Sequence, residues 1–221
     1  TLPVGRARSL ALLDDLAEGD LLAVGVQRDP QVEDPNLADL FAIATLGRIR
    51  QLVRPSRGPV QLVLEGQRRV HLESLTGAQG WQATVTKVHE RSGADHETRA
   101  LAEVLLEQIR DLAPSFSDHL REGLDHPATR KDPGRVADLV AGGLGLDADK
   151  ESRVLLALDI PTRLRVVLDL AAEAQLVAEL KTKLAEEVRD GIGKHQREAM
   201  LREQLRAIKK ELGEEGDEAQ D

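Results

Sequence analysis

The sequence predicts an α+β fold, in which a small β barrel with one helix is followed by an α-helical bundle and a long C-terminal helix. Short apolar segments separated by Gly- and Pro-containing turns fill residues 1–91. Residues 92–172 show amphipathic helical periodicity, and residues 173–221 contain no proline. With 221 residues, of which 41% are hydrophobic, the chain is long enough for one or two domains with a real core.

The composition excludes several classes of function. Without cysteine the chain has no disulfide framework, no thiolate zinc site and no cysteine nucleophile, which also fits a reducing compartment. Its only aromatic residues are Phe41, Trp81 and Phe116, and its net charge is −9, so nucleic acid is a poor partner. No apolar run could cross a membrane, and no signal-peptide pattern opens the chain. We therefore expect a cytoplasmic protein that binds neither membranes nor nucleic acid.

Residues 1–91 begin with one helix and continue as strands. Leu10, Leu13 and Leu16 recur at helical spacing until Gly19 ends the run. The segments that follow are rich in β-branched and alternating apolar residues, and turn-forming Pro, Gly, Asn and Asp lie between them. Strands are predicted over residues 21–27, 43–53, 59–66, 68–75 and 81–88.

Residues 92–172 are predicted to form a helical bundle. An apolar stripe marks a first helix over residues 97–113. A second helix begins at Asp132, an N-cap residue followed by proline, and ends at the glycine pair 142–143. A third, short helix is predicted over residues 147–158.

One very long helix is predicted to follow. Asp159 can cap it, with Pro161 in the first turn, and the segment 162–212 then contains no proline. As a straight helix this segment would reach ~76 Å. Gly191 and Gly193 interrupt it, each at a cost of ~1 kcal/mol relative to Ala, and are therefore a candidate hinge.

Apolar residues near the end of this helix need a partner. Leu201, Leu205, Ile208 and Leu212 are spaced four, three and four residues apart, which is a two-heptad seam. Burying four such side chains is worth ~6–12 kcal/mol. Together with the adaptable Met200 they are candidate contacts for a substrate or another protein. The preceding apolar residues are instead expected to pack within the chain: Val166, Val167, Leu170, Leu176, Leu180 and Leu184.

The recognisable motifs of enzymes are missing. The sequence holds no G-x-x-x-x-G-K-[ST] phosphate loop, no G-x-S-x-G elbow and no H-E-x-x-H. Arg68 and Arg69 could bind a carboxylate or a phosphate, or one could stay exposed while the other makes a structural pair. A metal could in principle be held by His89, Glu90 and His96, but we expect these histidines to be solvated at the surface.

Several segments resemble one protein family, in the family's own order. The helix that precedes the ATPase module of Lon-family ATP-dependent proteases is strongly resembled by KHQREAMLREQLRAIKKELGE (194–214). The central strands of the Lon N-terminal domain are similar to EDPNLADLFAIATLGRIRQ (33–51) and LEGQRRV (64–70), and the start of its first helix to VGRARSL (4–10). Its helical subdomain is resembled by DPGRVADLVA (132–141) and DADKESRVLLALDIPTRL (147–164).

The resemblance implies a fragment with a PUA-like β barrel. Residues 1–91 would be the β-rich lobe, 92–172 the helical subdomain and 173–221 the helix leading toward the ATPase module. In the family, the ATPase that binds ATP and Mg²⁺ and the peptidase with its Ser–Lys dyad come after this region, so we expect no catalytic residue, cofactor or metal here. The family usually has one more strand ahead of the VGR segment, so the barrel is expected to be incomplete at one edge.

The implied function is recognition of misfolded or tagged protein substrates and support of a homo-hexamer. On this reading Phe41 and Trp81 line a shallow apolar groove that binds exposed hydrophobic stretches; the alternative for both is burial in the core. A second reading is a free-standing adaptor or ligand-binding protein with a Lon-like domain. A third reading is an RNA-binding module. The equal numbers of acidic and basic residues in 1–91 argue against it, because binding to RNA depends on an excess of positive charge.

Overall fold

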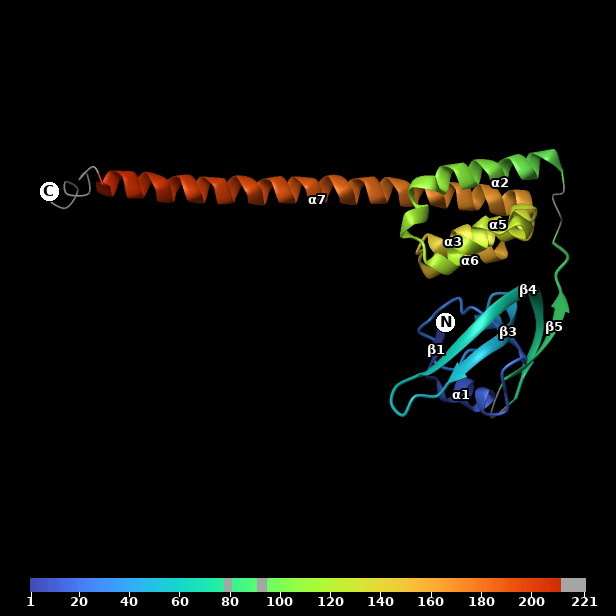
Figure 1. The fold of residues 1–221 in the computed structure, drawn as a ribbon. Helices are drawn as coiled ribbons and strands as arrows, with labels where there is room; N and C mark the ends of the chain where they lie inside the picture. The colour runs from blue at the N-terminus through green and yellow to red at the C-terminus, as the bar shows by residue number, and fades with distance from the viewer. Residues whose placement is uncertain (78–80, 91–94, 212–221) are drawn as a thin grey trace. The chain divides into compact units, whose positions relative to one another are not determined.

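Antiparallel strand pairing organises the first part of the chain (Figure 1). The structure is a computed structural model that describes residues 1–77, 81–90 and 95–211, with the backbone alone for residues 190–197 and 209–211. The chain divides into two units, Thr1–Ala171 and Ala172–Asp221.

The strands form one sheet in the order β1-β4-β3-β2, with β5 also paired to β4. Their bounds are β1 Leu2–Val4, β2 Leu21–Val24, β3 Ile43–Val53, β4 Val60–Thr76 and β5 Gln82–Lys87.

Two predicted strands are in fact one. The sequence predicts separate strands over 59–66 and 68–75, whereas β4 continues through both. Gly47 pairs with Gly66 while Leu46 pairs with Arg68, so Gln67 is an extra residue in β4. This extra residue is a β-bulge. Next to it the backbones approach closely, since a Cβ added to Gly47 would lie 3.2 Å from the Glu65 carbonyl oxygen. The glycines therefore mark a bulge and a close backbone approach instead of a turn.

The predicted barrel is an open sheet in the part of the chain that the structure describes. There β2 pairs only with β3, and no ladder joins it to β1 or β5. The first strand, expected to be missing, is present, because β1 pairs with the start of β4. Two small clusters of side chains form the core of this part, one on Leu40, Ala44, Val70 and Leu72 and one on Leu13, Ile49 and Leu62. The second cluster packs α1 (Ala7–Asp14) against the sheet.

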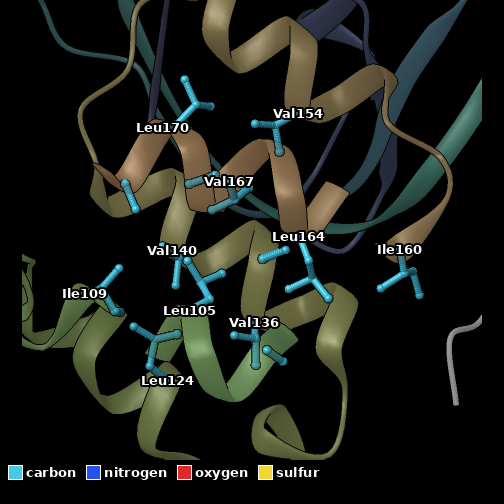
Figure 2. Close-up of a cluster of buried hydrophobic side chains, with 14 of the residues drawn as sticks. Leu105, Ile109, Leu124, Val136, Val140, Val154, Ile160, Leu164, Val167 and Leu170 are labelled. Carbon is cyan, nitrogen blue, oxygen red and sulfur yellow. The ribbon is translucent and has the colours of Figure 1, made fainter. Parts of the chain in front are cut away.

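The helices that follow share the largest core of the protein (Figure 2). Leu105, Val136, Val140, Leu164 and Val167 are all fully buried in it, and Figure 2 shows their side chains pointing toward one another. The α+β prediction is thus confirmed. The helices are α2 His96–Gln108, α3 Asp118–Asp125, α4 Pro127–Arg130, α5 Pro133–Gly143, α6 Ala148–Leu156 and α7 Ile160–Glu211, and three short 3-10 turns are η1 Leu37–Asp39, η2 Ile109–Asp111 and η3 Ala113–Ser115.

Side-chain caps begin these helices where the sequence predicts them. The Asp132 carboxylate accepts the backbone N–H of Arg135 at 3.1 Å, and Asp159 accepts that of Thr162 at 3.1 Å. At the other end of α5 a second reason for glycine appears, because a Cβ on Gly143 would lie 2.8 Å from the Phe116 ring. The glycine is needed for packing as well as for ending the helix. Helices α3 and α4 were not predicted.

Helix α7 changes its surroundings along its length. Leu164, Val167 and Leu170 are buried in the bundle, where the α2 residue Gln108 donates to the Leu168 carbonyl oxygen at 3.2 Å (Figure 1). From Leu176 to Ile208 the large apolar side chains that the structure describes are exposed. The prediction that Leu176, Leu180 and Leu184 pack within the chain is therefore wrong: they are 57%, 55% and 61% exposed. The helical backbone continues through Gly191 and Gly193, and their role as a hinge stays a prediction.

Truncating a buried leucine should show how much stability the bundle core provides. Leu105 is fully buried, whereas its neighbour Val104 on the same helix is 55% exposed. Leu105→Ala should lower the free energy of unfolding by about 2–5 kcal/mol, because it removes apolar contacts and leaves a cavity. Val104→Ala should change it by less than about 0.5 kcal/mol. Urea unfolding followed by circular dichroism measures both, and equal losses would contradict the assigned core.

Acid should weaken the start of α2. The Asp95 carboxylate accepts the backbone N–H of Thr98 at 2.7 Å, and this hydrogen bond lowers the pKa of Asp95. Because the folded pKa lies below the unfolded one, the stabilisation is present above about pH 4 and is lost as pH falls through the folded pKa. Asp95→Asn keeps the cap but does not titrate. The urea midpoint of the wild type should therefore fall more between neutral pH and about pH 3 than that of Asp95→Asn; parallel pH profiles would contradict this.

Candidate functional site

A cluster of four charged side chains joins the sheet to the helices within the first unit. The guanidinium of Arg69, on β4, donates two parallel hydrogen bonds to Asp138, on α5, at 2.9 and 2.8 Å. It also donates to Glu90 at 3.3 Å and, through Nε, to the Leu155 carbonyl oxygen at 2.9 Å. A planar guanidinium suits this two-pronged contact with a carboxylate.

Arg163 completes the cluster from the first turn of α7. Its Nη1 lies 3.3 Å from Asp138 and its Nη2 lies 3.2 Å from Glu90, while Nε donates to the Ala157 carbonyl oxygen at 2.9 Å. We call Arg69, Glu90, Asp138 and Arg163 the arginine hub. Arg163 is fully buried and Arg69 is 9% exposed. Since two cations meet two anions, the formal charges cancel and the burial of both arginines is compensated.

The electrostatics of Arg69 reflect this balance. Burial removes the guanidinium from water and by itself lowers its pKa. The hydrogen bond to Asp138 and the charges of Asp138 and Glu90 act the other way and outweigh burial, so the pKa of Arg69 is raised above its ordinary value. Arg69 therefore keeps its charge although it is buried, and the hub acts as a structural clamp.

An open cleft of about 650 Å³ lies against the hub, between β4 and the helices α5 and α6. Arg68 and Arg135 line it together with Glu151. Of the two adjacent arginines singled out from the sequence, Arg69 binds a carboxylate of the protein itself, and Arg68 is exposed. Glu90, considered as a metal ligand, instead pairs with the two arginines. In the described residues no three His, Asp or Glu side chains gather as a metal site would need.

Phe41 and Trp81 lie at separate points along the sheet. Both are half-buried and neither belongs to a core cluster, so each leaves part of its ring accessible. The Arg28 guanidinium lies over the Phe41 ring at 4.9 Å, and that of Arg8 over the Trp81 ring at 5.6 Å. Phe41 lies just before β3 and Trp81 just before β5, and these two strands pair with opposite edges of β4. The structure thus provides two aromatic–arginine contacts at the surface instead of one shared pocket.

The predicted partner contacts on α7 are exposed. Met200 is 61% exposed, and Leu201, Leu205 and Ile208 are 55–56% exposed. Leu212 lies outside the described residues. Further upstream, Leu176, Val177, Leu180, Leu184 and Val188 are exposed too. Of the described helices none is long and apolar enough to span a bilayer.

Sequence reasoning identified Arg69 and considered Glu90 but did not connect them with Asp138 and Arg163. One signal was available: Arg163 and Leu164 adjoin in a segment whose apolar spacing requires burial, and a buried arginine needs an acidic partner. The identity of the acidic partner depends on how α5 packs against β4, because Asp138 and Arg69 are 69 residues apart in the sequence. That placement is a tertiary contact and has no local signature.

Removing one member of the hub should destabilise the first unit. Arg69→Met leaves two carboxylates with one cation and deletes the bond to the Leu155 carbonyl oxygen. It should cost roughly 2–4 kcal/mol, less than for a sealed pair because Asp138 is 40% exposed. The control Arg68→Met, at the exposed neighbour, should cost less than about 0.5 kcal/mol. Chemical denaturation compares the two; similar values would show that the hub is not a clamp.

The comparisons with known proteins agree with this architecture. The family model described as "ATP-dependent protease La (LON) substrate-binding domain" matches residues 1–173. "Lon protease 4" of Sorangium cellulosum (strain So ce56) is 45% identical over 99% of this chain, which spans 27% of that protein. "Lon protease 2" of Myxococcus xanthus is 31% identical over 96% of this chain and 26% of that protein. The chain thus spans about a quarter of the length of these relatives.

A solved structure shares the fold. The "N terminal domain of Mycobacterium avium complex Lon protease" superposes with a TM-score of 0.52 at 20% identity, covering 70% of this chain and 90% of that one. The family model covers both the sheet and the helical bundle, so it includes every residue of the arginine hub. The chain belongs to the family of Lon substrate-binding domains.

Proposed function

We propose that this chain is the non-catalytic N-terminal part of an ATP-dependent Lon-type serine protease, that it captures misfolded or tagged proteins, and that it supports assembly of a homo-hexamer. The match of the family model over residues 1–173 carries the proposal. ATP and Mg²⁺ would bind in an ATPase module, and the Ser–Lys dyad would lie in a peptidase module, both elsewhere in the protein. We also propose that the protein works in the cytoplasm.

Client capture needs accessible apolar or aromatic groups on a firm support. Phe41 and Trp81 meet this requirement, because each ring is partly accessible and each is held from one side by an arginine. Aromatic rings with an adjacent guanidinium are typical contact residues of protein interfaces. Exposed hydrophobic stretches of an unfolded chain would stack on the rings, and the arginines would attract its acidic residues.

Subunit contacts would use a different surface. The large apolar side chains of α7 that the structure describes between Leu176 and Ile208 are exposed within this chain. Soluble proteins rarely leave so many apolar side chains on one element without a partner. In a ring of subunits these residues would be covered by neighbouring chains or by the module that follows.

Binding of an unfolded protein tests the proposed client contacts. A permanently unfolded, fluorescently labelled, carboxymethylated model protein should bind the full chain in fluorescence anisotropy. Phe41→Ala and Trp81→Ala should each weaken binding by roughly 5-fold or more, as expected for interface aromatics. Each substitution removes a contact between one arginine and the face of one ring, so both variants should remain folded. Thermal unfolding checks this.

The matched control is Val104→Ala, an exposed apolar residue on α2. It should leave the affinity for the unfolded protein unchanged. If the folded aromatic variants bind as tightly as the wild type, Phe41 and Trp81 are not client contacts. If the wild type itself does not bind, client capture by this part of the protein is refuted.

A further inference from the structure

The cleft beside the arginine hub is lined by charged side chains that the hub does not use. These are Arg68, Arg135 and Glu151, and all three are exposed. Within the part of the chain that the structure describes, none of their side chains makes a hydrogen bond or an ion pair. The other charged residues that line the cleft are already engaged, in the hub or as the cap of α5: Arg69, Glu90, Asp138 and Asp132.

The β-bulge in β4 brings Arg68 into the cleft. In a regular strand consecutive side chains point to opposite faces, so Arg68 and Arg69 could not both line one cleft. Gln67 is the extra residue of the bulge, and it lines the cleft together with both arginines. Bulges often redirect a side chain next to a functional site. Here the bulge supplies the cleft with an arginine that has no partner in the described chain.

The hub fixes Arg68 and Arg135 on two sides of one rigid contact. Arg69 on β4 and Asp138 on α5 are joined by hydrogen bonds of 2.9 and 2.8 Å. Arg68 adjoins Arg69 in the chain, and Arg135 precedes Asp138 by three residues on α5. Residues three apart on a helix have Cβ atoms about 5–6 Å apart on the same side. Two free guanidinium groups therefore stand next to the hub, one on the strand and one on the helix.

Glu151 and an apolar wall complete the cleft from α6 and α5. Arg69 donates to the Val154 carbonyl oxygen at 3.4 Å, and Glu151 precedes Val154 by three residues on α6. Glu151 is therefore one helical turn from the hub, as Arg135 is. Val154, Leu155 and Leu139 line the same cleft with apolar side chains. The cleft thus combines two free cations, one free anion and an apolar wall.

A ligand that matches these groups carries both charges. Guanidinium groups suit a carboxylate, and the carboxylate of Glu151 suits an ammonium group. A phosphate or a nucleic acid would be repelled by Glu151 and Asp132. A short peptide with free ends carries a carboxylate, an ammonium group and apolar side chains between them. The cleft volume of about 650 Å³ lies within the range of roughly 300–1,000 Å³ that is typical of sites for ligands of this size.

We propose that the cleft between β4, α5 and α6 binds a short apolar peptide with free ends. Its carboxylate lies between Arg68 and Arg135, its ammonium group pairs with Glu151, and its side chains pack on the apolar wall. The site involves neither Phe41 nor Trp81. Its failure would therefore leave client capture unaffected, and a failure of client capture would leave this site unaffected.

Isothermal titration calorimetry on the full chain tests the class of ligand, with trileucine as the probe. Trileucine should bind, and converting its carboxylate to an amide or acetylating its amine should each raise the dissociation constant on the order of 10-fold, because each change removes a charge-assisted hydrogen bond. Inorganic phosphate at the same concentration should not displace it. No binding of trileucine at millimolar concentration, equal binding of either blocked peptide, or displacement by phosphate would overturn the proposal.

Two substitutions test the placement of the peptide ends. Arg135→Gln should weaken trileucine binding on the order of 10-fold and reduce the preference for the free carboxylate over the amide, while the preference for the free amine remains. Glu151→Gln should do the reverse. Both residues are exposed, so both variants should remain folded, which circular dichroism checks.

The matched control is Arg57→Gln, at an exposed arginine between β3 and β4 that does not line the cleft. It should leave the dissociation constant of trileucine within about two-fold and keep both preferences. If Arg135→Gln or Glu151→Gln binds all three peptides as the wild type does, the proposal is overturned.

Discussion

Helix α7 has to satisfy two surroundings with one continuous backbone, and the rest of the structure depends on how it does so. Its first turns supply Leu164, Val167 and Leu170 to the core of the helical bundle, and Arg163 to the arginine hub. Beyond Ala171 the same apolar spacing continues, but within the chain nothing covers the described side chains from Leu176 to Ile208. The helix thereby connects a well-packed unit to a surface that needs another molecule.

The arginine hub explains how the first unit can serve as a firm support for binding. The sheet has only small clusters of buried side chains, whereas the bundle has a large one. Arg69 and Arg163 fasten the two to the same pair of carboxylates on Glu90 and Asp138. Removing one member of a buried ion pair leaves an uncompensated charge, so the hub holds the sheet and the bundle in this one arrangement. A clamp of this kind suits a domain that must hold Phe41 and Trp81 in place while a flexible client binds.

Much of this fold can be predicted from local patterns, and the exceptions have physical causes. The caps at Asp132, Asp147 and Asp159 and the apolar stripe of α2 are local signals, and each element begins where they indicate. A break between two strands is predicted at residue 67, where β4 instead has a β-bulge, because glycine next to the break is common both in bulges and in turns. The burial of Leu176, Leu180 and Leu184 was mispredicted because heptad spacing does not say whether the partner lies in the same chain.

The central claim is that the apolar face of α7 beyond Ala171 is covered by another molecule and not by its own chain. Hydrogen exchange of the backbone amides, followed by mass spectrometry over a range of protein concentrations, tests it most directly. Residues 164–171 should be protected at every concentration, while residues 176–189 should exchange fast in dilute solution and become protected as the concentration rises. Equally strong protection of both segments in the dilute monomer would contradict the account, because the chain itself would then cover the face.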